Sequence, residues 1–375
     1  MSPGTMPPDR YVLTWVSTAP GGAERSVAEL ATTLCSGGHQ VHVVLWDQAG
    51  RTLSPALPLP FDLTLVTDFA AYRQALDQAL APGAMALIST HRTATVDIDA
   101  ARPHGVVVLP VLRALLLDQG RLRMLDPATG HLRATPLPQV DWDAWARAHC
   151  WVGVSAAATR SLTHHAPRPI RALTIHNGVA ADHLPFSTPG RVRRAAVVAR
   201  LEEWKRIDRV IDAYAALPSW ARDRMRLDVY GDGPARPALA DRIDRHGMAG
   251  HITLRGHTGV WRASSDLLVS ACEVEAFGRV VIEAGMAAIP QIVPDRGGSA
   301  ELVMDEITGL RYDPTVPGAL TEALARAAAW DTPALTHYAW AARAHARRFD
   351  ITGYAAAYTA LAHDLTAHAA LPAAA

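Results

Sequence analysis

Short apolar runs alternate with longer amphipathic segments along this chain of 375 residues. Apolar runs bounded by turn residues are typical of strands buried on both faces, and the amphipathic segments between them are typical of helices that connect parallel strands. The predicted strands are residues 11–16, 40–45, 63–66, 85–89, 105–109, 150–154 and 171–175, then residues 195–199, 225–230, 252–254, 266–270 and 291–293. The pattern occurs twice, which favours an α/β chain of two doubly wound, Rossmann-like domains that face a cleft.

Residues 180–191 separate the two series. They contain two prolines and a glycine without hydrophobic periodicity, as expected of a linker. A chain of this length also exceeds what one hydrophobic core usually serves. We therefore predict a first domain over residues 1–182, a second over residues 192–349 and a C-terminal segment over residues 350–375. Residues 354–370 form an Ala-rich predicted helix, and periodicity alone leaves open which domain it packs on.

Residues 120–135 break this rhythm. Residues 121–125 alternate like a strand, and turn residues separate them from the short run 131–133. We predict a β-hairpin insertion in the first domain. A basic amphipathic helix that contacts a membrane is the alternative, but Pro127 and Gly130 interrupt any helical stripe, so we favour the hairpin.

The charge balance and the cysteines exclude several classes of protein. Lys plus Arg equals Asp plus Glu at 36 each, so no global field attracts nucleic acid or an anionic membrane. Cys35, Cys150 and Cys272 are far apart and lack CxxC spacing, which argues against a disulfide framework and against a zinc site. The first residues do not resemble a signal peptide, and no apolar stretch reaches the length of a membrane span. We expect a soluble cytoplasmic protein, monomeric or homodimeric.

Lys205 is the single lysine among the 36 lysines and arginines. An ammonium group is a flexible point charge, whereas a guanidinium is a planar fork, so a lysine in an arginine-rich chain can mark a place where a point charge is needed. Lys205 and Arg200 both follow the predicted strand 195–199, and phosphate is the obvious ligand for them. A surface lysine retained by chance is the alternative.

Two glycine loops follow predicted strands. Gly21 and Gly22 precede a helix that begins near Ala23, where backbone N–H groups and a helix N-terminus can receive phosphate. A mere tight turn is the alternative. Residues 231–233 form the second loop, which lacks the third glycine of a dinucleotide-binding fingerprint.

Glu275 and Glu283 flank a predicted junction between a loop and a helix. Glu275 should lie in the loop and Glu283 within the first two turns of the helix. Gly278 between them allows the backbone to approach a ligand, and the amides beside it begin a helix whose positive end would face phosphate. The two carboxylates then offer acceptors for hydroxyl groups on either side of an anion. The alternative is that Glu275 caps the helix and Glu283 is solvated.

With these motifs the chain resembles glycosyltransferase family 4, whose members are retaining enzymes with the GT-B fold. Three of the family's elements, R-x4-K, E-x7-E and GG-x-x-E, are matched in order by Arg200 and Lys205, by Glu275 and Glu283, and by Gly297, Gly298 and Glu301. Residues 21–24 resemble its first glycine loop, and residues 175–179 resemble the signature that ends its first domain. The resemblance covers nearly the whole chain and is strongest over residues 194–312.

The resemblance implies that the second domain mainly binds a nucleotide-sugar donor and that the first mainly binds an acceptor. It implies that Arg200 and Lys205 hold the diphosphate, that Glu283 binds the ribose hydroxyls and that Glu275 binds the sugar hydroxyls. It also implies that the C-terminal helix crosses back to the first domain. The remaining predicted donor-binding residues are Gly21, Gly22, Arg255, Gly256, Ala276, Phe277 and Gly278. Of these, Arg255 and Gly256 belong to the segment 255–258, which should lie near the base.

His91 and Arg113 lie in the first predicted domain, and Arg206 and Ala276 lie in the motifs of the second. The resemblance implies that His91 lies near the primary hydroxyl of the sugar and acts with Arg200, Lys205 and Glu275 in catalysis, although a plain loop histidine is the alternative. Arg113 stands where the family often has a histidine, which bears on the acceptor contacts. Arg206 and Ala276 each replace a frequent glycine.

The sequence thus predicts a metal-independent, retaining glycosyltransferase of the hexosyl-transferring type. It would move a sugar from a nucleotide-sugar co-substrate, with a UDP-sugar favoured, to a hydroxyl of a small-molecule or saccharide acceptor. Cations that stabilise the charge on the leaving phosphate can replace a metal, so neither metal nor cofactor is expected. A GT-B epimerase or phosphorylase, and a non-catalytic subunit that binds a sugar nucleotide beside a partner, are the alternatives.

Overall fold

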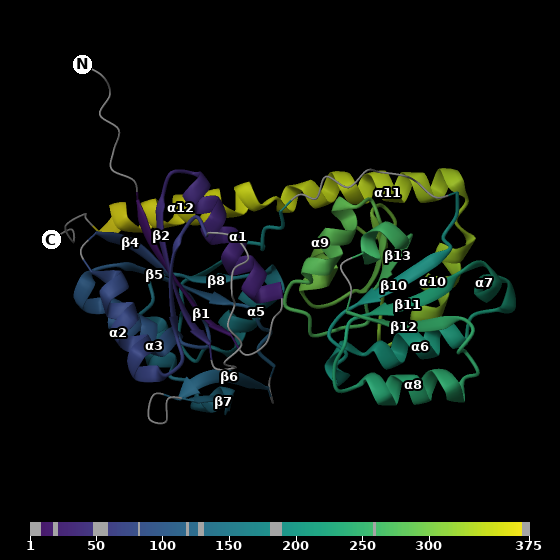
Figure 1. The fold of residues 1–375 in the computed structure, drawn as a ribbon, viewed down its shortest axis with the longest axis horizontal. Helices are drawn as coiled ribbons and strands as arrows, with labels where there is room; N and C mark the ends of the chain where they lie inside the picture. Colours follow the sequence, from purple (N-terminus) through teal and green to yellow (C-terminus); the bar gives the residue numbers. More distant parts are fainter. Residues whose placement is uncertain are drawn as a thin grey trace, which may run out of the picture. The chain divides into compact units, whose positions relative to one another are not determined.

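The computed structural model describes residues 9–17, 22–47, 59–81, 83–117, 120–126, 131–180, 190–257 and 260–369. The chain forms two compact units (Figure 1). The first comprises Met1–Ala180 and Ile351–Ala375, and the second comprises Ala181–Asp350. Most of the predicted linker, residues 181–189, lies outside the described residues.

The first unit is built on a seven-stranded parallel sheet with the order β3-β2-β1-β4-β5-β8-β9. Its strands are β1 (Arg10–Ser17), β2 (Gln40–Asp47), β3 (Asp62–Val66), β4 (Ala84–Thr90), β5 (Val107–Leu112), β8 (Trp151–Gly153) and β9 (Ala172–Thr174). All seven predicted strands of this half are present. β5 begins two residues later than predicted because Gly105, at φ 65°, ends a short 3-10 helix instead of starting the strand.

Helices cover both faces of this sheet. They are α1 (Gly22–Ser36), α2 (Phe69–Leu80), α3 (Ala94–Ala101), α4 (Trp142–Ala146), α5 (Ala156–His165) and α12 (Ile351–Ala369), with 3-10 turns at Arg102–His104 and Leu137–Gln139. α12 packs against α1, β4 and β5, whereas α2 and α3 pack together (Figure 1). The C-terminal helix therefore belongs to the first unit, as the resemblance implied. Its buried face includes Tyr354, Tyr358 and Leu365.

The predicted hairpin insertion is confirmed. β6 (Arg121–Asp126) pairs with β7 (His131–Pro136) in antiparallel register from Arg121 opposite Pro136 to Asp126 opposite His131. The turn residues 127–130 lie outside the described residues. The backbone N–H of Leu125 donates to the carbonyl of Arg92 at 2.7 Å, which fastens the hairpin to the loop after β4.

The second unit is built on a six-stranded parallel sheet with the order β12-β11-β10-β13-β14-β15. Its strands are β10 (Arg194–Val198), β11 (Arg226–Tyr230), β12 (Ile252–Gly256), β13 (Leu267–Val269), β14 (Gln291–Pro294) and β15 (Gly309–Tyr312). The sequence did not predict β15, because its four residues include an exposed arginine and give no apolar run. Gly309 allows this edge strand to pair closely, since a Cβ there would lie 2.1 Å from the carbonyl oxygen of Gln291.

Six helices and four 3-10 turns surround this second sheet in the part of the chain that the structure describes. The helices are α6 (Ile207–Ala215), α7 (Ser219–Arg224), α8 (Arg236–Arg245), α9 (Arg279–Met286), α10 (Ala319–Ala329) and α11 (Thr332–Ala346). The 3-10 turns are Glu203–Lys205, Trp261–Ser264, Gly298–Leu302 and Arg347–Phe349. Aliphatic side chains of the strands and of α6 and α10 form the core of the unit. None of the described helices is both long and apolar enough to cross a membrane.

The strand order reverses once in each sheet. β1 lies between β2 and β4, and β10 lies between β11 and β13. In open parallel sheets, ligands bind outside the carboxyl ends of the strands at such a reversal, because the connections diverge there and leave a crevice. The two places to examine are therefore the segments that follow β10 and β13 and those that follow β1 and β4.

Candidate functional site

Arg200 lies on the loop that follows β10, and a glycine loop supports it. The backbone N–H of Leu201 donates to the carbonyl of Asp232 at 2.9 Å. A Cβ on Gly231 would lie 1.8 Å from the carbonyl oxygen of Ala199, which a side chain there could not relieve. The loop 231–233 thus packs against the backbone of the Arg200 segment. Its comparison with a dinucleotide-binding fingerprint did not predict this role.

Lys205 ends a 3-10 turn on the same segment and reaches the loop after β13. Its Nζ lies 2.5 Å from Oε2 of Glu275 and 4.0 Å from the ring centroid of Trp204. Burial lowers the pKa of the Lys205 ammonium, but the charge and hydrogen bond of Glu275 more than offset this, so the pKa lies above its usual value. Lys205 is therefore a positive point charge at the reversal in strand order.

Arg200 pairs with a carboxylate of its own loop. Its guanidinium donates to Glu202, and the other carboxylate oxygen of Glu202 accepts from the indole N–H of Trp204. The Arg200 side chain is 51% exposed, so solvent and a ligand can both reach it. Glu202 and Trp204 were not predicted as site residues, although both lie within the R-x4-K motif.

The loop that carries Glu275 is held by the glycine pair Gly297 and Gly298. Gly297 has φ 73°, and the N–H of Gly298 donates to the carbonyl of Glu275 at 2.7 Å. A Cβ on Gly298 would lie 2.0 Å from the carbonyl oxygen of Ala276. The GG-x-x-E element therefore positions the Glu275 loop by close backbone packing.

Phe277 and Gly278 connect this loop to α9. The Phe277 ring is buried, with its centroid 6.2 Å from that of Phe349, so only its backbone can face a ligand. Gly278 has φ 95° and directly precedes α9. A residue with a Cβ is strained at this φ, which explains why glycine stands here.

Glu283 lies in the second turn of α9, as predicted, and its side chain is 7% exposed. The structure therefore excludes the alternative of a solvated helix residue. Nη1 of Arg262 and Nε of Arg279 lie 3.8 Å and 3.7 Å from its carboxylate oxygens. The sequence did not predict either arginine. The i, i+4 spacing of Arg279 and Glu283 was a usable signal, whereas Arg262 comes from a separate turn and gave none.

Three further ion pairs involve the segments that follow β10, β13 and β14. Arg209, in α6, donates to Glu273, and Nη1 of Arg296 lies 4.0 Å from the same carboxylate. Arg206 adopts φ 53°, where its family resemblance led us to expect glycine, and its guanidinium contacts Asp208 at 3.2 Å. This φ is uncommon for a residue with a side chain.

Arg255 and Gly256 lie at the end of β12. Nε of Arg255 donates to Asp228 at 2.8 Å, and this hydrogen bond raises the pKa of Arg255. The Asp228 side chain is buried and also contacts Arg194, so it is part of an internal ion pair. The carbonyl of Gly256 accepts from the N–H of Gly231 at 2.8 Å. That these residues face a base stays a prediction, and residues 258 and 259 of this loop lie outside the described residues.

The remaining predicted residues belong to the first unit. Gly21 lies outside the described residues, and Gly22 is the first residue of α1. His91 directly follows β4 and is buried at 6% exposure. Burial, together with the positive charges of Arg92 and Arg113, lowers the pKa of His91 to about 3, so the imidazole is neutral near pH 7. Its burial is unlike that of a plain loop histidine.

Among the described residues no cluster of His, Cys, Asp and Glu has the arrangement of a metal site. The structure therefore brings together two groups of predicted residues. Arg200, Lys205, Glu275, Gly278 and Glu283 lie in the second unit around the reversal at β10 and β13. Gly22 and His91 lie in the first unit, on the segments that follow β1 and β4.

The chain is similar to several known proteins. Residues 186–336 match the family described as Glycosyl transferases group 1. A glycogen synthase of Mycobacterium tuberculosis is 25% identical over 333 residues, which cover 78% of this chain and 79% of that protein. An exopolysaccharide phosphotransferase of Streptomyces coelicolor is 32% identical over 133 residues, and the match spans 34% of this chain but 14% of that protein.

The fold also has known counterparts. The structure of Anabaena HepE in complex with UDP matches with a TM-score of 0.76 and 20% identity, covering 95% of this chain and all of that one. The similarity extends through both units. The chain therefore has the GT-B fold, and its residues 186–336 match the group 1 glycosyl transferases.

Proposed function

We propose that this protein is a metal-independent, retaining glycosyltransferase that moves a hexosyl group from a UDP-sugar to a hydroxyl of a small-molecule or saccharide acceptor. The observation that carries the proposal is the 2.5 Å contact between Lys205 and Glu275, which joins the two matched motifs where the strand order of the second sheet reverses. The match of this segment to group 1 glycosyl transferases supports it. The complex of HepE with UDP supports uridine as the base.

The chemistry depends on charge that develops on the leaving group. The bond between the anomeric carbon and the diphosphate oxygen breaks with its electron pair on the phosphate, and the acceptor oxygen bonds to the anomeric carbon from the same face. The acceptor proton moves to the leaving phosphate oxygen, so no protein base is required. Attack from the same face likewise requires no protein nucleophile. Arg200 and Lys205 stabilise the departing charge more strongly than they stabilise the intact donor, and such differential binding lowers the barrier.

Arg200 and Lys205 should contribute more to stabilising the leaving phosphate than the N-terminus of α9 does. A unit charge about 4 Å from the phosphate contributes about 4 kcal/mol at an effective dielectric constant near 20. The half-charge at the start of α9 contributes at most about half as much. Two such cations supply the charge that a divalent metal supplies in other transferases, so EDTA should leave the activity unchanged.

The two carboxylates and the histidine orient the donor by hydrogen bonds to its hydroxyl groups. Glu283, held by Arg262 and Arg279, accepts from the ribose hydroxyls, and Glu275 accepts from hydroxyls of the transferred sugar. His91 is neutral near pH 7, so it can exchange hydrogen bonds with a sugar hydroxyl without adding a second positive charge. The acceptor is held by the first unit.

The decisive experiment is the substitution Lys205→Ala in the full chain. We expect UDP to stabilise the wild-type protein by about 2.7 kcal/mol at 100 times its dissociation constant, and to stabilise it more than GDP or ADP does. Lys205→Ala should remove most of this stabilisation and lower turnover by roughly a hundredfold or more, because the phosphate loses a cation worth several kcal/mol. Lys205→Arg should also lose activity, since a fork does not replace a point charge. Thermal shift and release of UDP from UDP-sugars measure these effects.

The control is Arg326→Ala, which removes an exposed arginine that pairs with Glu306 elsewhere in the second unit. It should leave UDP binding unchanged. Wild-type UDP binding by Lys205→Ala would refute the role of the cation. Release of free UDP that depends on an acceptor separates a transferase from an epimerase or phosphorylase, and turnover by the purified chain excludes a non-catalytic subunit.

A further inference from the structure

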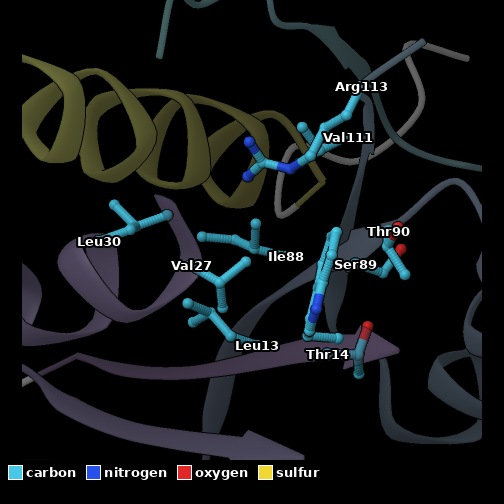
Figure 2. A pocket seen from close by; sticks show the side chains of 10 residues that line it. Leu13, Thr14, Val27, Leu30, Ile88, Ser89, Thr90, Val111 and Arg113 are labelled. Atoms are coloured by element: carbon cyan, nitrogen blue, oxygen red, sulfur yellow. The ribbon is translucent and has the colours of Figure 1, made fainter. Parts of the chain in front are cut away.

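A pocket lies in the first unit, where the order of its sheet reverses between β1 and β4. The space between its side chains is about 240 Å³ when the solvent at its open mouth is included, with room inside for about one water-sized group. It is lined by residues of β1, β4, β5 and α1 together with Arg113, which follows β5. Figure 2 shows the apolar side chains of Leu13, Val27, Leu30 and Ile88 along one side and Arg113 reaching in from the end of β5. Ligands bind at such reversals of strand order in open parallel sheets, so this pocket is a candidate binding position like the one beside β10 and β13.

Arg113 brings a positive charge that no described carboxylate balances. Its guanidinium donates to Oδ1 of Asn177 at 2.7 Å and to the hydroxyl of Tyr354 at 3.4 Å, both of which are neutral. It also lies 6.0 Å from the ring centroid of Trp15, and Arg92 lies over the same ring at 5.6 Å. Cation–π contacts and neutral acceptors compensate a half-buried guanidinium only in part, which leaves it attractive to an anion.

Two buried polar groups line the same pocket without a partner. The indole N–H of Trp15, 3% exposed, and the hydroxyl of Ser89, 2% exposed, form no hydrogen bond with any residue that the structure describes. An unsatisfied buried donor costs about 1–3 kcal/mol, which a ligand or a water in the pocket would recover. An indole N–H can only donate, and a hydroxyl can donate. Both therefore suit an acceptor-rich ligand such as an oxyanion.

We propose that this pocket binds the carboxylate or phosphate group of an anionic acceptor. Arg113 supplies the charge and a fork of parallel N–H donors, and Trp15 and Ser89 donate to the remaining oxygens. The inference rests on the proposed function, since it names the class of acceptor that the first unit holds. A neutral acceptor could accept hydrogen bonds from both donors, but it would leave the charge of Arg113 without a counter-ion.

The competing explanation is structural. Arg113 connects β5 to Asn177 and to α12 through Tyr354, so it could serve only to fasten the C-terminal helix. That role predicts a loss of stability when Arg113 is replaced and no loss of anion binding. Tyr354→Phe is the matched variant, because it removes the hydroxyl that contacts Arg113 and leaves the charge in place.

Isothermal titration of the full chain tests the proposal in the presence of saturating UDP, with glucuronate, glucose 1-phosphate and glucose as probes. We expect one or both anions to bind and neutral glucose to bind much more weakly, and the two anionic arms decide between carboxylate and phosphate. Arg113→Gln should weaken anion binding at least about tenfold with the affinity for UDP unchanged, as expected for loss of a charge-assisted hydrogen bond. Tyr354→Phe should bind the anion like wild type.

Ser89→Ala keeps the test valid if Arg113→Gln unfolds. The Ser89 hydroxyl has no described partner, so its removal should leave the melting temperature unchanged and weaken anion binding severalfold. Wild-type anion affinity in Ser89→Ala and in folded Arg113→Gln would overturn the proposal, as would equal binding of glucose. A protein that fails to bind UDP but shows the Arg113-dependent anion site would instead refute the donor assignment alone.

Discussion

Each cation of the proposed phosphate site faces a carboxylate of its own unit. Arg200 contacts Glu202, and Lys205 contacts Glu275. These carboxylates hold the cations in place, and a diphosphate would compete with them for the same N–H donors. The affinity for the nucleotide is therefore the difference between two ionic interactions and not the full strength of one. Glu202 is not part of the E-x7-E motif, so it can be replaced without changing the proposed contacts of Glu275 and Glu283 with the donor.

Glu202→Gln should tighten UDP binding up to about fivefold, because an exposed ion pair contributes about 0.2–1 kcal/mol and the variant no longer competes for Arg200. Isothermal titration measures the change. Glu306→Gln, which removes a carboxylate paired with Arg326, is the control and should have no effect. Weaker binding by Glu202→Gln would show that Glu202 orients Arg200 and that competition is unimportant.

A buried carboxylate in the first unit makes the stability of the fold depend on pH. Asp97 of α3 is completely buried and accepts hydrogen bonds from Thr14 at 2.9 Å, Tyr72 at 2.7 Å and Thr93 at 2.6 Å. Burial raises the pKa of Asp97 to about 6, although the three hydroxyl groups act in the opposite direction. The folded state thus holds the proton more tightly than the unfolded state, whose value is about 3.8.

The stability supplied by protonated Asp97 should be present below about pH 4 and lost as the pH rises to about 6. A rise in pKa of this size corresponds to about 3 kcal/mol. The free energy of unfolding of wild type minus that of Asp97→Asn should fall by this order between pH 4 and pH 7, because the asparagine does not titrate. Urea unfolding at several pH values measures it. A difference that stays flat or rises with pH contradicts the assignment.

At the scale of elements, both loops of the candidate site depend on glycines that pack against them. The loop 231–233 supports Arg200, and Gly297 and Gly298 support the Glu275 loop. Neither glycine pair needs to touch a ligand for this. Close backbone packing explains why a loop can be positioned accurately although loops usually vary more than strands.

Gly298→Ala should displace the Glu275 loop, because its Cβ would lie 2.0 Å from the carbonyl oxygen of Ala276. We expect UDP affinity to fall at least about tenfold and stability to fall by about 1–3 kcal/mol or more. Gly250→Ala is the matched control: nothing lies within 4 Å of its Cβ, so stability should change by less than about 0.5 kcal/mol. Calorimetry and UDP titration measure both variants, and unchanged UDP affinity in Gly298→Ala would show that the loop does not depend on this glycine.

At the scale of the whole molecule, the chain leaves the first unit, builds the second and returns. α12 packs against α1, β4 and β5, and its beginning lies against the segment that follows β9. A Cβ on Gly178 would lie 2.6 Å from Cβ of Tyr354, and the hydroxyl of Tyr354 donates to Asn177 at 3.3 Å. The last helix therefore completes the core of the unit that was formed first along the chain.

Leu365→Ala should destabilise the first unit without affecting UDP binding by the second. Leu365 is buried in α12, and replacing a buried leucine by alanine costs about 2–5 kcal/mol. Leu65→Ala, at an exposed leucine of β3, is the control and should cost much less. Calorimetry with and without UDP measures both, and loss of UDP affinity in folded Leu365→Ala would contradict the separation of roles.

The sequence by itself determined the elements and the motifs, because both are local. Strands of buried apolar residues, the hairpin around residues 120–135, and Glu283 on a helix all follow from the order of neighbouring residues. The position of α12 was implied by the family resemblance. The periodicity of an Ala-rich helix does not indicate which domain it packs against. β15 was missed because it is too short and too polar to produce a pattern.

Only the tertiary structure decided which charges meet. Lys205 and Glu275 are 70 residues apart, and they contact because β10 and β13 pair side by side. Arg262 reaches Glu283 from another turn, and the glycines of residues 231–233 support Arg200 from a neighbouring strand. Periodicity reports how one segment is buried, whereas the electrostatics of a site depend on distances between segments, and the packing of the sheet sets those distances.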